Sequence, residues 1–206
     1  MNILEIKDGN ISDINLGLIQ LKNYDLKLDK YVSKIVIQDS NGTTVKEYDN
    51  ETTAKFELDA KKLNGTNVII EYKIVVTNNG EVAGYARKIA DYMSTELKFS
   101  SELNKDWYQV GNTIYTTKLA NEIINPGETK EITLTLTKVM NENNTGLIPN
   151  TAEIAEDYNE LGLLDSNSTP GNNLNGENDM GMAEVIISIR TGAVVYTTIA
   201  IIIVAI

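Results

Sequence analysis

The strongest constraint on the fold is a stretch in which apolar and polar residues alternate. Between residues 68 and 76 every second position is apolar: Val68, Ile70, Tyr72, Ile74 and Val76. In an extended chain successive side chains point to opposite faces, so this spacing places all five on one face of a β-strand. Such a face is buried when a second layer packs against it. The pattern therefore predicts a β-sheet protein.

The same period of two recurs along most of the chain. It predicts strands near residues 26–32, 82–92, 132–136, 148–156 and 183–189, with Asn-Gly turns at 41–42 and 64–65. Eight or nine short strands with Asn/Gly turns and no sustained helical period indicate an all-β fold, an Ig-like antiparallel β-sandwich.

Three local predictions accompany this fold. Residues 78–80 (Asn-Asn-Gly) form a two-residue hairpin turn into the strand at 82–92. Residues 125–128 (Asn-Pro-Gly-Glu) fit a type II turn, with Pro and Gly at its central positions. Residues 94–103 form a short helical turn.

Composition excludes several classes of function. The 206 residues contain no histidine and no cysteine, which excludes Ser-His and Cys-His nucleophile pairs and nearly all zinc sites. The net charge of −11 argues against nucleic acid as a partner, because nucleic acids bind basic patches. Since disulfides are expected in a eukaryotic secreted domain, a cysteine-free exported β-protein points to a bacterial surface of the Gram-positive kind.

The C-terminal end is apolar. Residues 193–206 contain no charged side chain. A membrane-spanning helix needs about 20 apolar residues, so we interpret this run as part of a truncated transmembrane anchor. A buried β-strand is the alternative, because Val194, Val195 and Ile199 are β-branched. Residues 1–17 contain no export signal, so a chain cut at both ends from a longer protein is the simplest account.

Five segments stand in an order that is familiar from a known family. They are DLKLDKYVSK (25–34), YKIVVTNNGEVAGYARKIADYMSTELKF (72–99), NPGETKEITLTLTK (125–138), NTAEIAED (150–157) and DSNSTPGN (165–172). Together they resemble the Ig-like repeat domains of Gram-positive, Clostridia-type cell-surface proteins known as domain of unknown function eleven. The resemblance covers about residues 24–206. It implies a structural or adhesive module, next to further repeats and ahead of a C-terminal membrane helix.

Three polar residues fall on strand faces that the alternation predicts to be buried. Lys30, Asp91 and Asn150 are each in phase with the apolar residues of their own strands. Burying a Lys or an Asp is costly unless the charge is paired. A buried lysine, an acid and an asparagine on different strands are the constellation for a self-formed isopeptide bond. In this chemistry a neutral lysine amine attacks the asparagine carboxamide and a protonated acid assists.

Ordinary structural roles compete with this hypothesis. The stem of Lys30 can lie along the core while its amine reaches the sheet edge. Asn150 can bond a loop backbone, and Asp91 can cap a turn. Lys27 is out of phase and Lys34 lies near the end of the strand, so both are poorer candidates for the crosslink.

The segment 157–179 is rich in acids and amides. Asp157, Asp165, Asn167 and Asp179 are candidate Ca²⁺ ligands, because Ca²⁺ prefers oxygen donors. Their spacing matches no EF-hand loop, and a solvated acidic loop is the alternative. No other cofactor is predicted.

The predicted organisation has five parts. Residues 1–22 are the tail of a preceding module or a linker, 23–156 the sandwich, 157–181 an acidic Asn/Gly-rich loop, 182–190 the last strand and 191–206 the partial anchor. The leading interpretation is a non-catalytic structural or adhesive stalk module on the extracellular face of a bacterial membrane. Its partners would be the membrane and neighbouring repeats.

The second hypothesis is a module that binds a host protein, a glycan or a cell-wall polymer through its loops. Trp107 and Tyr108 are the aromatic candidates for that role, with burial in the core as the alternative for Trp107. An exposed aromatic patch near Trp107 would favour binding, whereas a uniformly acidic surface would favour a stalk.

Overall fold

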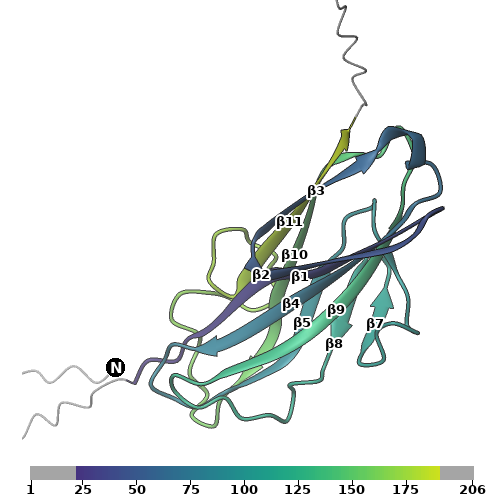
Figure 1. Cartoon of the computed structure of the whole chain (residues 1–206). Coiled ribbons are helices and arrows are strands. Elements are labelled where there is room, and N and C mark those ends of the chain that lie inside the picture. Colours follow the sequence, from purple (N-terminus) through teal and green to yellow (C-terminus); the bar gives the residue numbers. More distant parts are fainter. Residues whose placement is uncertain (1–21, 191–206) are drawn as a thin grey trace, which may run out of the picture.

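Strands dominate the part of the chain that the computed structural model describes, residues 22–190. They are β1 (Leu26–Asp39), β2 (Gly42–Glu51), β3 (Thr53–Asp59), β4 (Asn67–Asn78), β5 (Tyr85–Tyr92), β6 (Lys98–Phe99), β7 (Trp107–Val110), β8 (Thr113–Thr116), β9 (Thr129–Val139), β10 (Gly146–Tyr158) and β11 (Met180–Arg190), with one short 3₁₀ helix, η1 (Ala60–Lys62). The strands form two sheets that pack face to face (Figure 1). The prediction of an all-β sandwich is confirmed.

The first sheet has the strand order β2-β1-β4-β9-β6, and its neighbours are antiparallel. β4 lies at its centre, and its alternating face, Val68 to Val76, is fully buried against the second sheet. On β9 the same alternation buries Ile132, Leu134 and Leu136 and leaves the intervening threonines nearer to solvent. The hydrophobic pattern thus fixes which face of each strand joins the core.

The second sheet has the order β3-β11-β10-β5-β8-β7. Its pairs are antiparallel except for β3 and β11, which run parallel from Glu184↔Thr53 to Arg190↔Asp59. This departs from the predicted antiparallel sandwich. Parallel neighbours need a long connection, and β4 to β10 all lie in the chain between β3 and β11.

Two local predictions were wrong. Residues 78–80 do not close a hairpin, because β4 pairs with β1 and β9 whereas β5 lies in the other sheet. Asn78 instead stabilises the crossing between the sheets, since its Nδ2 donates to the carbonyl oxygens of Val82 and Ile124, each at 2.8 Å. Residues 94–103 form turns around β6, which adds to the edge of the first sheet beside β9, and no helix.

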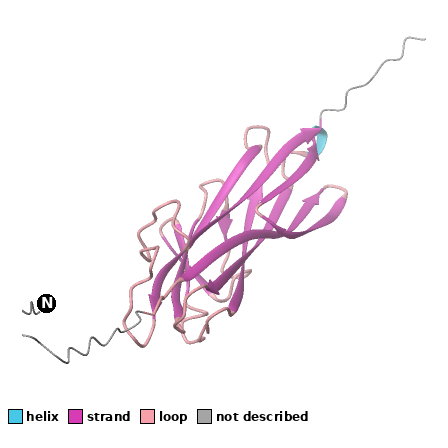
Figure 2. Cartoon of the chain, turned by 90° about the vertical axis from the view of Figure 1, so that its left-hand side faces the viewer, coloured by secondary structure: helices cyan, strands magenta, loops and turns pink. Residues whose placement is uncertain are grey.

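The sandwich is elongated, and the two ends of the described chain lie at opposite ends of it (Figures 1 and 2). Residues 159–179 form the long connection between β10 and β11. This connection packs near the entry of β1: the Ser166 amide donates to the Tyr24 carbonyl at 2.9 Å, and the Leu28 amide donates to the Asn178 carbonyl at 2.9 Å.

Two predictions fall on residues that the structure does not describe. Residues 1–21 of the predicted N-terminal tail (1–22) and the whole predicted anchor, 191–206, lie outside the described residues. Within residues 22–190 no helix is long and apolar enough to cross a membrane.

Candidate functional site: a buried lysine, aspartate and asparagine

The three polar residues singled out from the strand phases meet between the two sheets. Lys30 lies on β1 of the first sheet, opposite Ile74 of β4. Asp91 of β5 and Asn150 of β10 lie on neighbouring strands of the second sheet, where Asp91 pairs with Ala152. Their exposed fractions are 1%, 0% and 1%. The lysine therefore crosses the core to reach the two residues of the other sheet.

Asp91 holds the group together. Its Oδ2 accepts a hydrogen bond from Lys30 Nζ, in an ion pair whose two side chains are fully buried. The same oxygen accepts a hydrogen bond from Asn150 Nδ2 at 3.3 Å. Asp91 Oδ1 and Asn150 Oδ1 have no hydrogen-bond partner among the described residues. The arrangement brings the lysine amine and the carboxamide onto one acid.

Burial shifts the charge state of the pair. Removal from water lowers the pKa of Lys30, although the neighbouring Asp91 opposes this shift. It raises the pKa of Asp91, although Lys30 and Asn150 oppose that shift. Both directions favour a neutral amine beside a protonated carboxyl, because desolvation penalises charged forms. A proton passed from Lys30 to Asp91 removes both charges at once.

Tyr72 completes the surroundings of the amine. Its ring, fully buried on β4, lies with its centroid 4.6 Å from Lys30 Nζ. Its hydroxyl has no hydrogen-bond partner among the described residues. The alternation placed Tyr72 in the core, but nothing in the sequence indicated that it would lie against the amine.

A glycine on β11 accommodates the close packing of β1. A Cβ built on Gly181 would lie 2.8 Å from the Lys30 backbone nitrogen and 2.9 Å from Leu28 Cδ2. Real Cβ atoms do not come so near to a backbone atom, so a larger residue would force β11 away from β1. Gly181 thus allows the two strands to approach closely at the level of Lys30.

The neighbouring lysines point elsewhere. Lys27 pairs with Asp29 at 2.9 Å and Lys34 pairs with Glu71 at 3.3 Å, and all four side chains are partly exposed. Surface pairs of this kind contribute about 0–1 kcal/mol to stability. Of the three lysines on β1, only Lys30 enters the core.

Two of the four predicted calcium ligands, Asp165 and Asn167, have hydrogen-bond partners within the described residues. Asp165 accepts hydrogen bonds from the Leu26 amide at 2.8 Å and from the Asn167 amide at 3.2 Å. Asn167 Nδ2 donates to Asp25 Oδ2 at 3.3 Å. In residues 22–190 no group of three or more acidic side chains is arranged to hold a metal ion. The calcium site at Asp157, Asp165, Asn167 and Asp179 stays a prediction without structural support.

A second buried acidic region lies under the 159–179 connection and was not anticipated. Glu153 is fully buried; it accepts hydrogen bonds from the Tyr92 hydroxyl and from the Asn173 amide, the latter at 2.9 Å. Asp179 is 1% exposed, and neither of its carboxylate oxygens has a partner among the described residues. Glu153 belongs to the outward phase of β10, so the alternation did not indicate that a loop would cover it.

Trp107 belongs to the core. Its side chain is buried, and its indole Nε1 donates to the Thr133 carbonyl at 2.8 Å. Tyr108, the next residue on β7, is 45% exposed and packs beside Tyr115 with ring centroids 5.8 Å apart. The core alternative for Trp107 is therefore the correct one.

The comparisons with known proteins identify no family. No family model matches the chain, and no curated protein matches it. Two solved structures of the CARDB domain of PF1109 from Pyrococcus furiosus are similar in part. One is a solution NMR structure that is 12% identical in sequence. The match spans 82% of this chain and 98% of the CARDB chain, with a TM-score of 0.36. A crystal structure of that domain in complex with di-metal ions, 13% identical, covers 84% of this chain and 100% of its own with a TM-score of 0.39. At this level of similarity the comparison carries no conclusion about function.

Proposed function

We propose that this chain is a non-catalytic structural module of a bacterial surface protein, closed by an isopeptide bond between Lys30 and Asn150. The observation that carries the proposal is the convergence of Lys30, Asp91 and Asn150, all buried, on one carboxylate oxygen. A buried ion pair is a weak source of stability, because desolvation offsets most of the attraction. A covalent bond between Lys30 and Asn150 would account for the burial of these three polar residues, which the ion pair alone does not.

The first step is attack by the lysine. The lone pair of the neutral Lys30 Nζ attacks Asn150 Cγ and forms the new carbon–nitrogen bond. Half a turn of the Asn150 carboxamide about its Cβ–Cγ bond exchanges Nδ2 and Oδ1 and brings Oδ1 to Asp91 Oδ2. In that orientation the protonated Asp91 donates to Oδ1 and stabilises the negative charge that develops there.

The second step releases ammonia. Asp91 gives its proton to Oδ1, then takes a proton from the former lysine nitrogen and passes it to Asn150 Nδ2. The bond between Cγ and Nδ2 breaks and Nδ2 leaves as ammonia. As the carbonyl forms again, the proton on Oδ1 returns to Asp91. The reaction occurs once in each molecule and needs no oxidant, metal or cofactor.

The position of the bond suits a module under tension. β1 begins at one end of the sandwich and β11 ends at the other, so a pull on the two ends runs along the long axis (Figure 1). A bond from Lys30 to Asn150 would join the two sheets and shield the chain between them from extension. It would serve in place of the disulfides that a cysteine-free chain cannot form.

The mass of the intact full chain tests the proposal. We expect a mass lower than the sequence mass by one ammonia, and a protease-resistant peptide that joins the Lys30 strand to the Asn150 strand. Asp91→Asn keeps both reacting groups but removes the acid, so this variant should keep the full mass. Lys34→Met, at a surface lysine of the same strand, should form the bond as the wild type does.

Two results would overturn the crosslink. One is a wild-type mass equal to the sequence mass. The other is a loss of ammonia that maps to an Asn-Gly pair such as Asn41-Gly42, because such pairs lose ammonia on their own by succinimide formation. Peptide mapping separates the second result from a true crosslink.

A further inference from the structure

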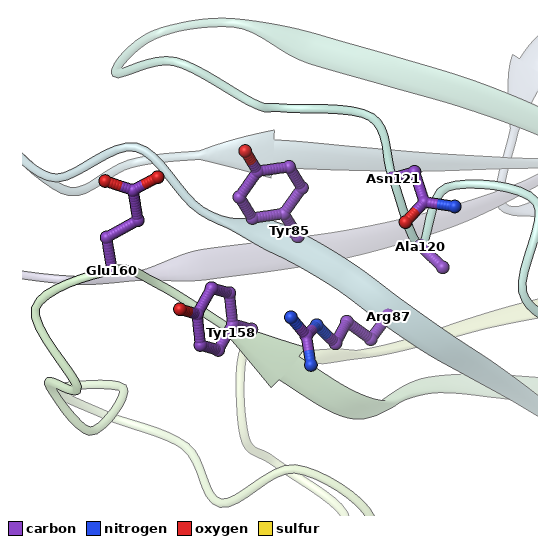
Figure 3. Close-up of a pocket in the computed structure, with 6 residues that line it drawn as sticks. All are labelled: Tyr85, Arg87, Ala120, Asn121, Tyr158 and Glu160. Atoms are coloured by element: carbon purple, nitrogen blue, oxygen red, sulfur yellow. The ribbon is translucent and has the colours of Figure 1, made fainter.

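A hollow opens on the outer face of the six-stranded sheet, away from the buried lysine. Figure 3 shows its lining: Tyr85 and Arg87 from β5, Tyr158 from the end of β10, Ala120 and Asn121 from the loop after β8, and Glu160 from the loop after β10. Its volume is about 250 Å³. Nothing in the proposed crosslink uses these residues.

The aromatic wall of the hollow is held by paired backbone. Tyr85 and Tyr158 are register partners on adjacent strands, and their ring centroids lie 6.1 Å apart at an interplanar angle of 40°. Tyr24, buried beneath them, donates its hydroxyl to the Tyr158 carbonyl at 3.3 Å. Gly84 leaves room for that tyrosine, since a Cβ there would lie 2.4 Å from the Tyr24 ring. The wall is formed before any ligand arrives.

Arg87 is oriented by stacking. Its guanidinium carbon lies 3.9 Å from the centroid of the Tyr158 ring. Among the described residues no carboxylate forms an ion pair with Arg87, although Glu160 lines the same hollow. Its donors therefore face the hollow without a protein acceptor of opposite charge.

A second hollow of about 190 Å³ adjoins the first and shares Tyr85 and Glu160 with it. Its remaining lining is apolar: Val82, Ala83, Ile123 and Leu161. Ile123 is 44% and Leu161 59% exposed. The two hollows form one trough, which we call the Tyr85 trough, with a polar aromatic part and an apolar part. Their sizes suit one small ligand, because sites for small molecules occupy about 300–1,000 Å³.

The chemistry of the trough selects the class of ligand. Aromatic faces pack against the C–H faces of a sugar ring, while a guanidinium, an amide and a carboxylate supply both donors and acceptors for its hydroxyl groups. Arg87 and Glu160 carry opposite charges, and the chain carries a net charge of −11, so a polyanion is repelled overall. A neutral sugar fits the aromatic and polar lining of the trough, and the negative charge of the chain does not repel it. The apolar part next to it suits a methyl group.

We propose that the Tyr85 trough binds a neutral glycan through an N-acetylhexosamine, with the sugar ring on Tyr85, the Arg87 guanidinium held in place by Tyr158, and the acetyl methyl group against Ile123 and Leu161. Arg87, Asn121 and Glu160 then hydrogen-bond the ring hydroxyls. The site lies on the outer face of the sheet, so binding does not depend on the crosslink.

Calorimetric titration of the full chain with an N-acetylglucosamine tetrasaccharide tests the proposal, with the matched glucose tetrasaccharide as the second probe. We expect the acetylated sugar to bind and the glucose sugar to bind about tenfold more weakly, because it lacks the acetamido group. Tyr158→Ala and Arg87→Ala should each weaken binding of the acetylated sugar by about tenfold or more. Tyr108→Ala, at an exposed tyrosine of the same sheet outside the trough, should leave it unchanged.

Three results would overturn the proposal. The first is absence of binding of the acetylated tetrasaccharide at millimolar concentration. The second is binding that survives both Tyr158→Ala and Arg87→Ala. The third is equal affinity for the two sugars, which would remove the role given to Ile123 and Leu161. Far-ultraviolet circular dichroism of each variant shows that a loss of binding is not a loss of fold.

Discussion

Asp91 and Asp179 are both buried carboxyl groups with raised pKa values, yet they stand in opposite environments. Asp91, between the sheets, has a lysine and an asparagine on one of its oxygens. Asp179, under the 159–179 connection, has no partner on either oxygen, and Glu153, Glu177 and Asp165 add to the effect of burial on its pKa. The two carboxyl groups are thus equally buried, but Asp91 lies beside a cation whereas the charged neighbours of Asp179 are acids.

The difference decides how each region becomes neutral. The core pair does so internally, by moving a proton from Lys30 to Asp91, and this is the state in which an amine can react. The charged groups that act on the pKa of Asp179 are all acids, so this region becomes neutral only by taking protons from solvent. Chemistry is expected in the first region, and dependence of stability on pH in the second.

The largest expected effect concerns the core pair. Lys30→Met removes the proposed crosslink, which costs about 4–5 kcal/mol of unfolding free energy if closure of a chain segment this long acts as a disulfide does. It also takes away the Nζ donor of the buried Asp91, and a buried polar group left without its partner costs about 1–3 kcal/mol more. Urea denaturation at pH 7 measures the sum.

A double variant separates the two contributions. Lys30→Met with Asp91→Leu removes the stranded charge as well, and neither it nor Lys30→Met can form the crosslink. The double variant should be the more stable of the two by about 2 kcal/mol or more, because an apolar pair replaces a buried ion. Equal unfolding free energies of the two variants would mean that a buried Asp91 without Lys30 does not destabilise the protein. The proposed difference in charge balance between Asp91 and Asp179 would then be wrong.

A smaller loss of stability is expected when Glu153, in the acidic region under the 159–179 connection, loses a hydrogen-bond donor. Tyr92→Phe removes the hydroxyl that donates to the buried Glu153 and should lower the unfolding free energy by about 1–2 kcal/mol. Because Glu153 also accepts from the Asn173 amide, exchange of that amide with deuterium should become faster. Tyr108→Phe, at an exposed tyrosine, is the control and should change the stability by less than about 0.5 kcal/mol. A loss no larger than that of the control would show that the Tyr92 hydroxyl contributes nothing.

Much of the fold was predictable because a strand with one buried face has apolar residues at every second position, a pattern that is visible locally in the sequence. β4 and β9 follow from the period of two, and the type II turn at residues 125–128 is confirmed by a Glu128 amide that donates to the Asn125 carbonyl at 2.8 Å with Gly127 at φ 77°. Pairing was less predictable. Asn-Asn-Gly at 78–80 suits a hairpin, but long-range hydrogen bonds of Asn78 direct the chain into the other sheet.

The sites show the same division. Lys30, Asp91 and Asn150 were found because a charged or amide residue in an apolar phase has to be explained by a partner. Glu153 and Asp179 were missed as a buried region, since their burial depends on where a long loop lies. The Tyr85 trough also depends on tertiary structure: Tyr85 and Tyr158 are far apart in sequence, and only the pairing of β5 with β10 brings them together.

The smallest expected effect tests the acidic region by its pH dependence. Burial and the neighbouring acids raise the pKa of Asp179 from 3.8 to about 7, so its contribution to stability is complete below about pH 4 and is lost as the pH rises through 7. Asp179→Asn, which cannot ionise, should therefore be more stable than the wild type at pH 8, on the order of 1 kcal/mol, with the advantage shrinking toward pH 4. Thermal denaturation across this range measures the difference, with Glu160→Gln, an exposed acid of the same loop, as the control. An advantage that is constant with pH would show that Asp179 keeps an ordinary pKa, and its contrast with Asp91 would then rest on packing rather than on charge.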